Sequence, residues 1–189
     1  MKILLIGKAG SGKSTVARYL IQKYNLKKYS LGDGVKHMTV DILNLCGIRV
    51  RIGDLYNTTR KKQYRRYMQQ IGTEICQKYF GKECWCNLLK NKIDNDLCED
   101  YVIDDIRFIT EYNYWYDDDT ISIKLVRNKA YLEQTHNAES MHQSETEMET
   151  IKCDYTINND DITLDELYKK IDEIILSEEN NSDDIFVVK

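Results

Sequence analysis

The stretch that decides the fold is Lys2-Ile3-Leu4-Leu5-Ile6-Gly7-Lys8-Ala9-Gly10-Ser11-Gly12-Lys13-Ser14, at the start of the chain. Residues 2–6 form a short, mainly apolar run that predicts a buried strand, and residues 14–24 repeat apolar side chains at helical spacing. The segment between them matches the pattern G-x-x-x-x-G-K-[ST], with a strand before it and a helix after it, as a phosphate-binding loop requires. We therefore expect this loop to bind the phosphates of a nucleoside triphosphate.

The loop residues have distinct expected contacts. Inward-pointing N–H groups of Gly10-Ser11-Gly12 and the positive end of the following helix favour a bound phosphate. Lys13 is expected to reach the β- and γ-phosphates, the Ser14 hydroxyl to bind Mg²⁺, and Thr15 to contact the α-phosphate. The alternative is a glycine-rich turn that ends in Lys-Ser by chance, and the match of both pattern and context argues against it.

Beyond the loop, the apolar spacing predicts strands that alternate with helices. This order predicts an α/β fold of three layers, a parallel sheet with helices on both faces. Residues 48–59 and 127–150 are predicted as loops. The expected strands are 27–31, 101–103, 120–126 and 155–157, and the expected helices are 33–47, 61–80, 85–97, 108–116 and 163–177.

Composition excludes several classes of protein. The chain has 189 residues and a net charge of −4, so it lacks the basic surplus of a duplex-binding protein. No stretch approaches the roughly 18–20 apolar residues of a membrane helix, and the initial apolar run is too short for a signal peptide. The six cysteines include no C-x-x-C spacing and are expected as reduced thiols. We expect a soluble cytoplasmic protein that binds neither nucleic acid nor membranes.

The domain organisation follows from the same patterns. Residues 1–177 are expected to form one domain. Within it, residues of about 128–150 have few apolar side chains and are expected as a mobile lid, because long polar segments are often functional. Residues 178–189 are expected as a loose acidic tail.

Two further groups of residues could bind a phosphate acceptor. Arg65, Gln69 and Gly72-Thr73 recur at i, i+4 and i+7 or i+8 on a predicted helix, so an arginine and an amide would share one face. Asp105 and Arg107 follow a predicted buried strand, which would place a carboxylate near Mg²⁺ and an arginine near a phosphate. The alternatives are a solvated basic face and an ordinary ion pair at a strand end.

One motif is rejected on its context. Residues 91–94 read Asn-Lys-Ile-Asp, which matches the guanine-reading N-K-x-D motif of GTPases. That motif follows a buried strand, whereas here it lies within a predicted amphipathic helix. We therefore interpret it as a coincidence.

Together these segments resemble the deoxynucleoside monophosphate kinases of bacteriophages and some large DNA viruses, which belong to the P-loop nucleoside monophosphate kinase superfamily. The resemblance covers most of the chain in the same order. Ser14, Gly32 and Gln77 depart from the family's pattern. The matching segments are 7–17, Leu31-Gly32-Asp33-Gly34-Val35-Lys36, the signature 65–74, Ile103-Asp104-Asp105-Ile106-Arg107-Phe108, His142-Gln143-Ser144-Glu145 and 154–159.

The resemblance implies an enzyme of deoxynucleotide biosynthesis that transfers the γ-phosphoryl group of ATP to a deoxynucleoside monophosphate. ATP and Mg²⁺ are then the cofactors and nucleotides the partners, with a homodimer left open. The implied roles are Lys36, Arg65 and Arg107 on the acceptor phosphate; Gln69 with Gly72 and Thr73 at the base; Asp33 and Asp105 at the metal's water shell or the acceptor cations; Glu145 at the base or sugar; and Arg127 on the ATP phosphates.

Two other functions stay open at this point. Animal phosphomevalonate kinases share the aspartate-x-arginine and histidine-x-serine-glutamate layout, although the segment from Gln69 to Glu74 suits a base better than an isoprenoid. The other is a regulatory protein that binds a nucleotide without turnover, against which the paired basic and acidic residues at both sites argue.

Overall fold

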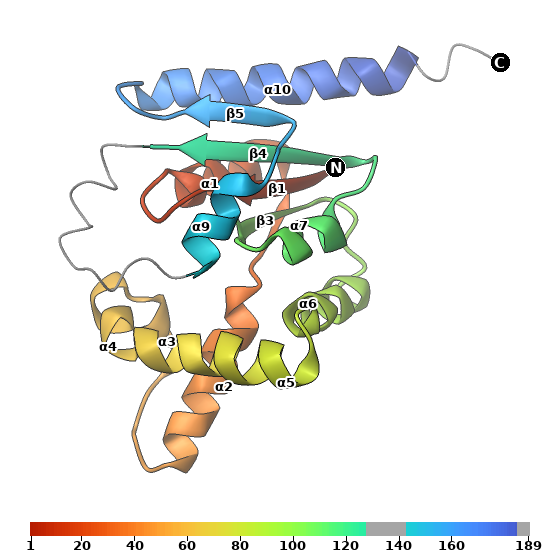
Figure 1. The fold of residues 1–189 in the computed structure, drawn as a ribbon. Coiled ribbons are helices and arrows are strands. Elements are labelled where there is room, and N and C mark those ends of the chain that lie inside the picture. Colours follow the sequence, from red (N-terminus) through yellow and green to blue (C-terminus); the bar gives the residue numbers. More distant parts are fainter. Residues whose placement is uncertain (128–142, 185–189) are drawn as a thin grey trace. The chain divides into compact units, whose positions relative to one another are not determined.

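A computed structural model describes residues 1–127 and 143–184 of the chain (Figure 1). The chain forms two compact units, one from Met1–Tyr29 and Glu99–Lys189 and the other from Ser30–Cys98. The expected lid lies largely in residues 128–142, outside the described residues, as does the end of the chain after residue 184.

The first unit is built on a five-stranded sheet in the order β2-β3-β1-β4-β5. Every pair of neighbouring strands is parallel, which confirms the predicted α/β fold. The strands are β1 (Lys2–Ile6), β2 (Lys27–Tyr29), β3 (Tyr101–Ile106), β4 (Thr120–Val126) and β5 (Tyr155–Asn158).

Helices cover both faces of this sheet. Side chains alternate along each strand, so each face presents its own set of residues to a layer of helices. On one face, β1 and β4 bury alternate residues such as Leu5 and Ile123 in a core shared with α1 (Lys13–Tyr24) and α10 (Leu164–Asp184). On the other face, the Tyr112 hydroxyl of α7 (Ile109–Trp115) forms a hydrogen bond with Ser122 Oγ of β4. Lys124 Nζ of β4 donates a hydrogen bond to the carbonyl oxygen of Glu149 in α9 (Gln143–Thr150). The three-layer prediction is therefore confirmed.

The pairing of β1 with β3 contains a β-bulge. Leu4 pairs with Ile103 and Ile6 pairs with Ile106, so Leu5 alone lies opposite Asp104 and Asp105. A bulge of this kind redirects side chains and is frequent beside active sites. It occurs here where two carboxylates end the strand.

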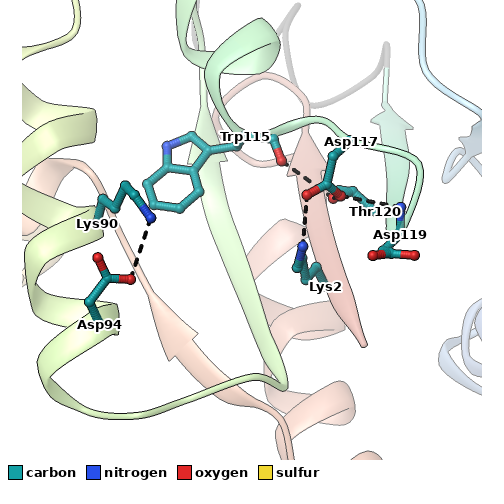
Figure 2. Close-up of polar contacts among 7 residues, drawn as sticks. All are labelled: Lys2, Lys90, Asp94, Trp115, Asp117, Asp119 and Thr120. Carbon is teal, nitrogen blue, oxygen red and sulfur yellow. Dashed lines mark hydrogen bonds and ion pairs between the residues drawn. The ribbon is translucent and has the colours of Figure 1, made fainter.

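Asp117 fixes the connection between α7 and β4 (Figure 2). Its carboxylate accepts hydrogen bonds from the Thr120 hydroxyl and from the Asp119 N–H, at 3.2 Å for the latter. The same carboxylate pairs with Lys2 Nζ at 2.7 Å, and the Thr120 hydroxyl oxygen lies 3.3 Å from the Trp115 carbonyl oxygen. The first residues of β1 and β4, which are neighbours in the sheet, are thereby joined by side chains as well.

The second unit is helical. Its described elements are α2 (Gly32–Leu45), α3 (Ile52–Tyr56), α4 (Thr58–Gln69), the π-helix η1 (Gln70–Gln77), α5 (Lys78–Phe80) and α6 (Cys84–Asn95). The predicted loop 48–59 was wrong in part, because it contains α3 and the start of α4. Asn57 begins α4 by accepting hydrogen bonds from the N–H groups of Thr59 and Arg60, both at 3.1 Å.

Residues 91–94 lie inside α6, as predicted, where the side chains of Lys90 and Asp94 form a pair at 3.4 Å one turn apart (Figure 2). The context that a guanine-reading motif requires, directly after a strand, is not met here.

The helix predicted over 61–80 is present but changes its period at Gln70. In η1 the hydrogen bonds skip one more residue than in an α-helix, so buried positions recur at wider spacing. Ile71 and Cys76, five positions apart, are buried, whereas Ile75, four positions after Ile71 where an α-helix would place a core side chain, is 47% exposed. The α-helical period of buried side chains therefore ends at Ile71.

The end of the chain also differs from the expectation. Residues 143–150, predicted within a loop, form α9, and residues 178–184, predicted as a loose tail, continue α10. A capping box precedes α10, since the Thr163 N–H donates to Glu166 Oε2 at 2.7 Å and the Glu166 N–H donates to Thr163 Oγ1 at 3.2 Å. None of the helices in the described part of the chain is both long and apolar enough to span a membrane.

Candidate active site

The phosphate loop of the first unit passes so close to its neighbours that two positions admit only glycine. A Cβ atom on Gly7 would lie 2.4 Å from the Leu125 carbonyl oxygen, and one on Gly12 would lie 2.5 Å from Asn159 Nδ2. Both residues also have positive φ angles, of 150° and 105°. The glycines of the motif are thus explained by contacts with β4 and with the residue that follows β5.

Lys13 folds back over the loop that precedes it. Its Nζ donates hydrogen bonds to the carbonyl oxygens of Gly7 and Lys8, the latter at 2.7 Å. The ammonium is half-buried, and the N–H groups of Thr15 and Val16 bond to the Gly12 carbonyl to begin α1. The lysine of the motif and the helix N-terminus therefore lie at the same loop, as the pattern predicts.

Asn159 supports the loop from the far end of the chain. Its Nδ2 donates to the Ser11 carbonyl oxygen at 2.9 Å. The Ser11 hydroxyl is buried and finds no hydrogen-bond partner among the described residues. A buried hydroxyl without a partner costs about 1–3 kcal/mol, so its presence inside the loop fits a ligand that brings hydrogen-bonding atoms. Sequence reasoning did not select Asn159, because a contact over 148 positions leaves no local pattern.

Asp104 is the strand-end carboxylate within electrostatic range of Lys13. It is 6% exposed and forms an ion pair with Lys28 Nζ at 2.7 Å. Burial and the neighbouring Asp105 raise the pKa of Asp104, while Lys28 and Lys13 lower it. Sequence analysis selected Asp105, which is half-buried, and gave Asp104 no role. Alternation with Val102, which packs in the α1 core, is the signal that could have singled out Asp104.

The turn that carries Arg107 is held by two glutamates. Glu111 Oε2 accepts hydrogen bonds from the Arg107 N–H at 2.9 Å and from the Phe108 N–H at 3.1 Å. Glu147 Oε1, from α9, accepts the Ile109 N–H at 3.1 Å. Glu111 is 5% exposed, and burial raises its pKa to about 7 against the effect of the two amides and of Arg107. The Arg107 side chain is exposed at this fixed turn.

Arg127 lies beside the phosphate loop. It lines a cavity of about 100 Å³ together with the following residues: Gly7, Lys8, Lys124, Leu125, Val126, Met148 and Glu149. Basic side chains outnumber acidic ones in this wall. Glu145 belongs to α9, but its side chain, like the whole of His142, lies outside the described residues.

In the second unit, Lys36 is fixed by two neighbours. Its Nζ pairs with Asp33 Oδ1 at 2.6 Å and lies 4.4 Å from the ring centroid of Tyr56. The Lys36 side chain is only 11% exposed. The predicted pairing of Asp33 with the acceptor lysine is therefore present, and Tyr56 is an addition that the sequence did not indicate.

The signature segment of the second unit is arranged differently from the expectation. Arg65 is exposed on α4 and Gln69 is half-buried at its end, but Gly72 and Thr73 lie in the π-helix η1 and do not continue the α-helical face of Arg65 and Gln69. Gly72 is buried, and its carbonyl oxygen accepts the Trp85 indole N–H at 2.9 Å. The α-helical spacing from Arg65 therefore holds only as far as Gln69.

The sequence model of the deoxynucleotide monophosphate kinase family matches residues 47–171 of the chain. The chain belongs to this family. It is a nucleoside monophosphate kinase, a phosphotransferase that uses ATP.

The kinase also shares its fold with solved structures. Shikimate kinase from Acinetobacter baumannii in complex with shikimate matches with a TM-score of 0.50 at 15% identity, over 94% of the kinase and 93% of that chain. TT1252 from Thermus thermophilus matches with a TM-score of 0.53 at 14% identity, over 94% and 97%. At these identities the likeness shows the fold alone. A search of curated proteins gives no significant match.

Proposed function

We propose that the kinase transfers the γ-phosphoryl group of ATP to the 5′-phosphate of a deoxynucleoside monophosphate and releases a deoxynucleoside diphosphate and ADP. The observation that carries this proposal is the phosphate loop of a family member, closed by Lys13 and containing a buried Ser11 hydroxyl that has no hydrogen-bond partner in the described part of the chain. An in-line transfer of this kind needs positioning and charge neutralisation more than covalent chemistry.

The first unit supplies the proposed ATP site. The N–H groups of Gly10-Ser11-Gly12 and the Lys13 ammonium would bind the β- and γ-phosphates, with Thr15 at the α-phosphate. Arg127 would add a positive charge, and its place in one cavity wall with Gly7 and Lys8 supports this role. A phosphate oxygen offers Lys13 a stronger, charge-assisted partner than the loop carbonyls it now contacts.

We propose Mg²⁺ as the metal, bound through Ser14 and Asp105. The Ser14 hydroxyl is exposed at the start of α1 and Asp105 is half-buried at the end of β3, so both can take a hydrated ion. No group of three metal-binding side chains occurs among the described residues, which fits an ion that keeps several waters and uses few protein ligands. When bound, the ion would neutralise charge on the transferring phosphates.

The second unit supplies proposed acceptor residues. Lys36, oriented by Asp33 and Tyr56, and Arg65 would bind the acceptor phosphate. Gln69 and Thr73 would contact the base. The carbonyl of Gly72 is already bonded to Trp85, so we propose that Gly72 acts through packing.

The acceptor phosphate oxygen is already anionic, so the reaction needs no strong general base. Catalysis would come from Lys13, Arg107 and Arg127, which stabilise charge on the transferring group. Glu145 is proposed to contact the base or sugar. By resemblance to the viral members, we also propose that the reaction serves deoxynucleotide biosynthesis in the cytoplasm of an infected host.

A coupled assay of ADP release tests this function. ATP and Mg²⁺ are incubated with a panel of deoxynucleoside and ribonucleoside monophosphates, with mevalonate 5-phosphate as a control acceptor and Lys13→Ala as a control enzyme. Release that depends on one or more deoxynucleoside monophosphates, and that the variant lacks, is the expected result. Turnover with the mevalonate ester alone, or ATP binding without any acceptor-dependent release, would overturn the proposal.

A further inference from the structure

The second unit contains an open cavity of about 600 Å³ that none of the proposed substrate residues lines. This volume lies within the range of about 300–1,000 Å³ that is usual for small-molecule sites. Its wall is polar and carries three arginines against one carboxylate. The lining residues are Asn44, Arg49, Val50, Arg51, Asp54, Arg60, Gln63 and Tyr64.

Two of the arginines come from a backbone segment that is firmly held. Between them, Val50 is buried, its carbonyl oxygen accepts Asn44 Nδ2 at 2.9 Å, and its N–H donates to Asn44 Oδ1 at 3.1 Å. Arg51 has an extended backbone, with φ −102° and ψ 149°. Arg49 and Arg51 are both exposed, whereas Val50 between them packs in the core of the second unit. Both line the cavity.

The charges in this wall do not cancel. Asp54 pairs with the Arg60 guanidinium and accepts the Arg51 N–H at 3.0 Å, so one carboxylate neutralises one arginine. Neither Arg49 nor Arg51 has a side-chain ion pair within the residues that the structure describes. Two guanidinium groups are thus available to an anion at one place.

The cavity and the proposed acceptor residues lie on different sides of α4. Each residue of an α-helix turns by about 100°, so Arg60, Gln63 and Tyr64 share one face. On the same count, Arg65 and Gln69 point to the far side of the helix. The cavity is therefore separate from the acceptor-binding face of α4.

We propose that this cavity is a second binding site, for a phosphate-bearing small molecule of nucleotide size. The planar guanidinium groups of Arg49 and Arg51 match the geometry of phosphate oxygens. The Tyr64 ring and the Gln63 amide supply an aromatic surface and hydrogen-bonding groups beside them. The site goes beyond the proposed function and does not depend on it, because binding there requires no phosphoryl transfer.

The test is calorimetric titration of the full chain with inorganic pyrophosphate and, separately, with dTTP. It uses a Lys13→Ala background, which disables the phosphate loop. The informative variant is Arg49→Gln with Arg51→Gln. The matched controls are Arg66→Gln, an exposed arginine of α4 outside the cavity wall, and Arg65→Gln on the acceptor side. If the double glutamine variant does not fold, the variant Arg49→Lys with Arg51→Lys replaces it, because lysine keeps the charge and lacks the planar guanidinium group.

We expect both probes to bind, and affinity to fall about tenfold or more in the double glutamine variant but not in either control. Tighter binding of dTTP than of pyrophosphate would support a contact between its base and Tyr64 or Gln63. The proposal is overturned if neither probe binds at millimolar concentration, or if Arg65→Gln removes binding and the double variant keeps it. A tenfold rise in the acceptor KM of the double variant, in a chain with Lys13 intact, would also overturn it, because the cavity would then be the acceptor site itself.

Discussion

Lys8 of the phosphate loop forms an ion pair with Glu149, the penultimate residue of α9. The backbone of Glu149 is held as well, because its carbonyl oxygen accepts Lys124 Nζ at 2.8 Å. Two residues earlier, Glu147 accepts the Ile109 N–H beside Arg107. One helix of two turns is therefore bonded both to the loop that binds ATP phosphates and to the turn that presents Arg107.

The ion pair should tune ATP affinity modestly. Glu149→Gln removes this ion pair of the Lys8 ammonium, and we expect the KM for ATP to change twofold to fivefold with little change in the KM for the acceptor. The pair is partly exposed, with Glu149 at 59%, so its contribution is about 0.2–1 kcal/mol and falls with salt. Glu173→Gln, which removes an exposed ion pair on α10, is the control. Equal effects of the two substitutions would contradict a role specific to α9.

Glu111 should make stability depend on pH. Its pKa is raised to about 7 in the folded protein by burial, from an ordinary value of 4.5. Between these two values the folded state keeps a proton that the unfolded chain has lost, so the free energy of unfolding falls as pH rises through this window. Glu111→Gln carries no such proton, and its amide oxygen can still accept the two N–H groups. We expect the free energy of unfolding of the variant to exceed that of the wild type by up to about 3 kcal/mol at pH 8.

Urea unfolding of the wild type and Glu111→Gln at pH 4.5 and pH 8 measures this difference. The variant and the wild type should have the same free energy of unfolding at pH 4.5, and the advantage of the variant should develop between pH 4.5 and 7. Comparing the two proteins at each pH removes the opposite slope from carboxylates with lowered pKa values, such as Asp172. A difference that is constant with pH would show that the Glu111 carboxyl titrates normally.

The bond between Trp85 and Gly72 should stabilise the π-helix. Trp85→Phe removes the indole N–H and leaves the Gly72 carbonyl without that donor in a buried place, at a cost of about 1–3 kcal/mol. Trp115→Phe is a matched control, because the Trp115 indole N–H is buried and has no partner within the described residues. Chemical unfolding should show the larger loss for Trp85→Phe, and amide exchange should accelerate in residues 70–77. A larger loss in the control would refute the role of the hydrogen bond.

Substitution of two adjacent arginines on α4 distinguishes a specific contact with the acceptor from an effect of net charge. Arg65→Ala is expected to raise the KM for the monophosphate about tenfold to a hundredfold, the loss of a charge-assisted contact worth about 1.5–3 kcal/mol. Arg66→Ala removes the same charge about 100° further around the helix and should change this KM little. Steady-state kinetics with saturating ATP measure both. Matching effects would indicate that only the net positive charge of α4 matters.

The parts of the site that the sequence predicted are those fixed by local rules. The phosphate loop follows from glycine spacing, since contacts at Gly7 and Gly12 leave no room for a Cβ atom. The capping box of α10 follows from a spacing of three residues, and the pair of Asp33 with Lys36 is one of the contacts that the family resemblance implied. Strand and helix order was likewise readable from apolar periodicity, and with it the parallel sheet.

The parts that sequence reasoning missed depend on contacts between distant segments or on a change of period. Asn159 reaches Ser11 from 148 positions away, and no local pattern marks the pair. Alternation with Val102 could have singled out Asp104, but no local pattern in the sequence shows the β-bulge that places Asp104 and Asp105 together opposite Leu5. Ile75 lies four positions after Ile71, where a period of 3.6 residues predicts a core side chain, but η1 does not keep that period and Ile75 is exposed.

The π-helix gives the second unit a built-in tolerance to a change in chain length. The buried Ile71 and Cys76 lie five positions apart, where an α-helix would place them four positions apart. Deleting one residue between them would restore the ordinary period while both side chains stay in the core. The indole of Trp85 would then face a regular turn in place of the Gly72 carbonyl. A kinase one residue shorter in this segment could therefore keep the fold of the unit and differ only in the residues that follow Gln69.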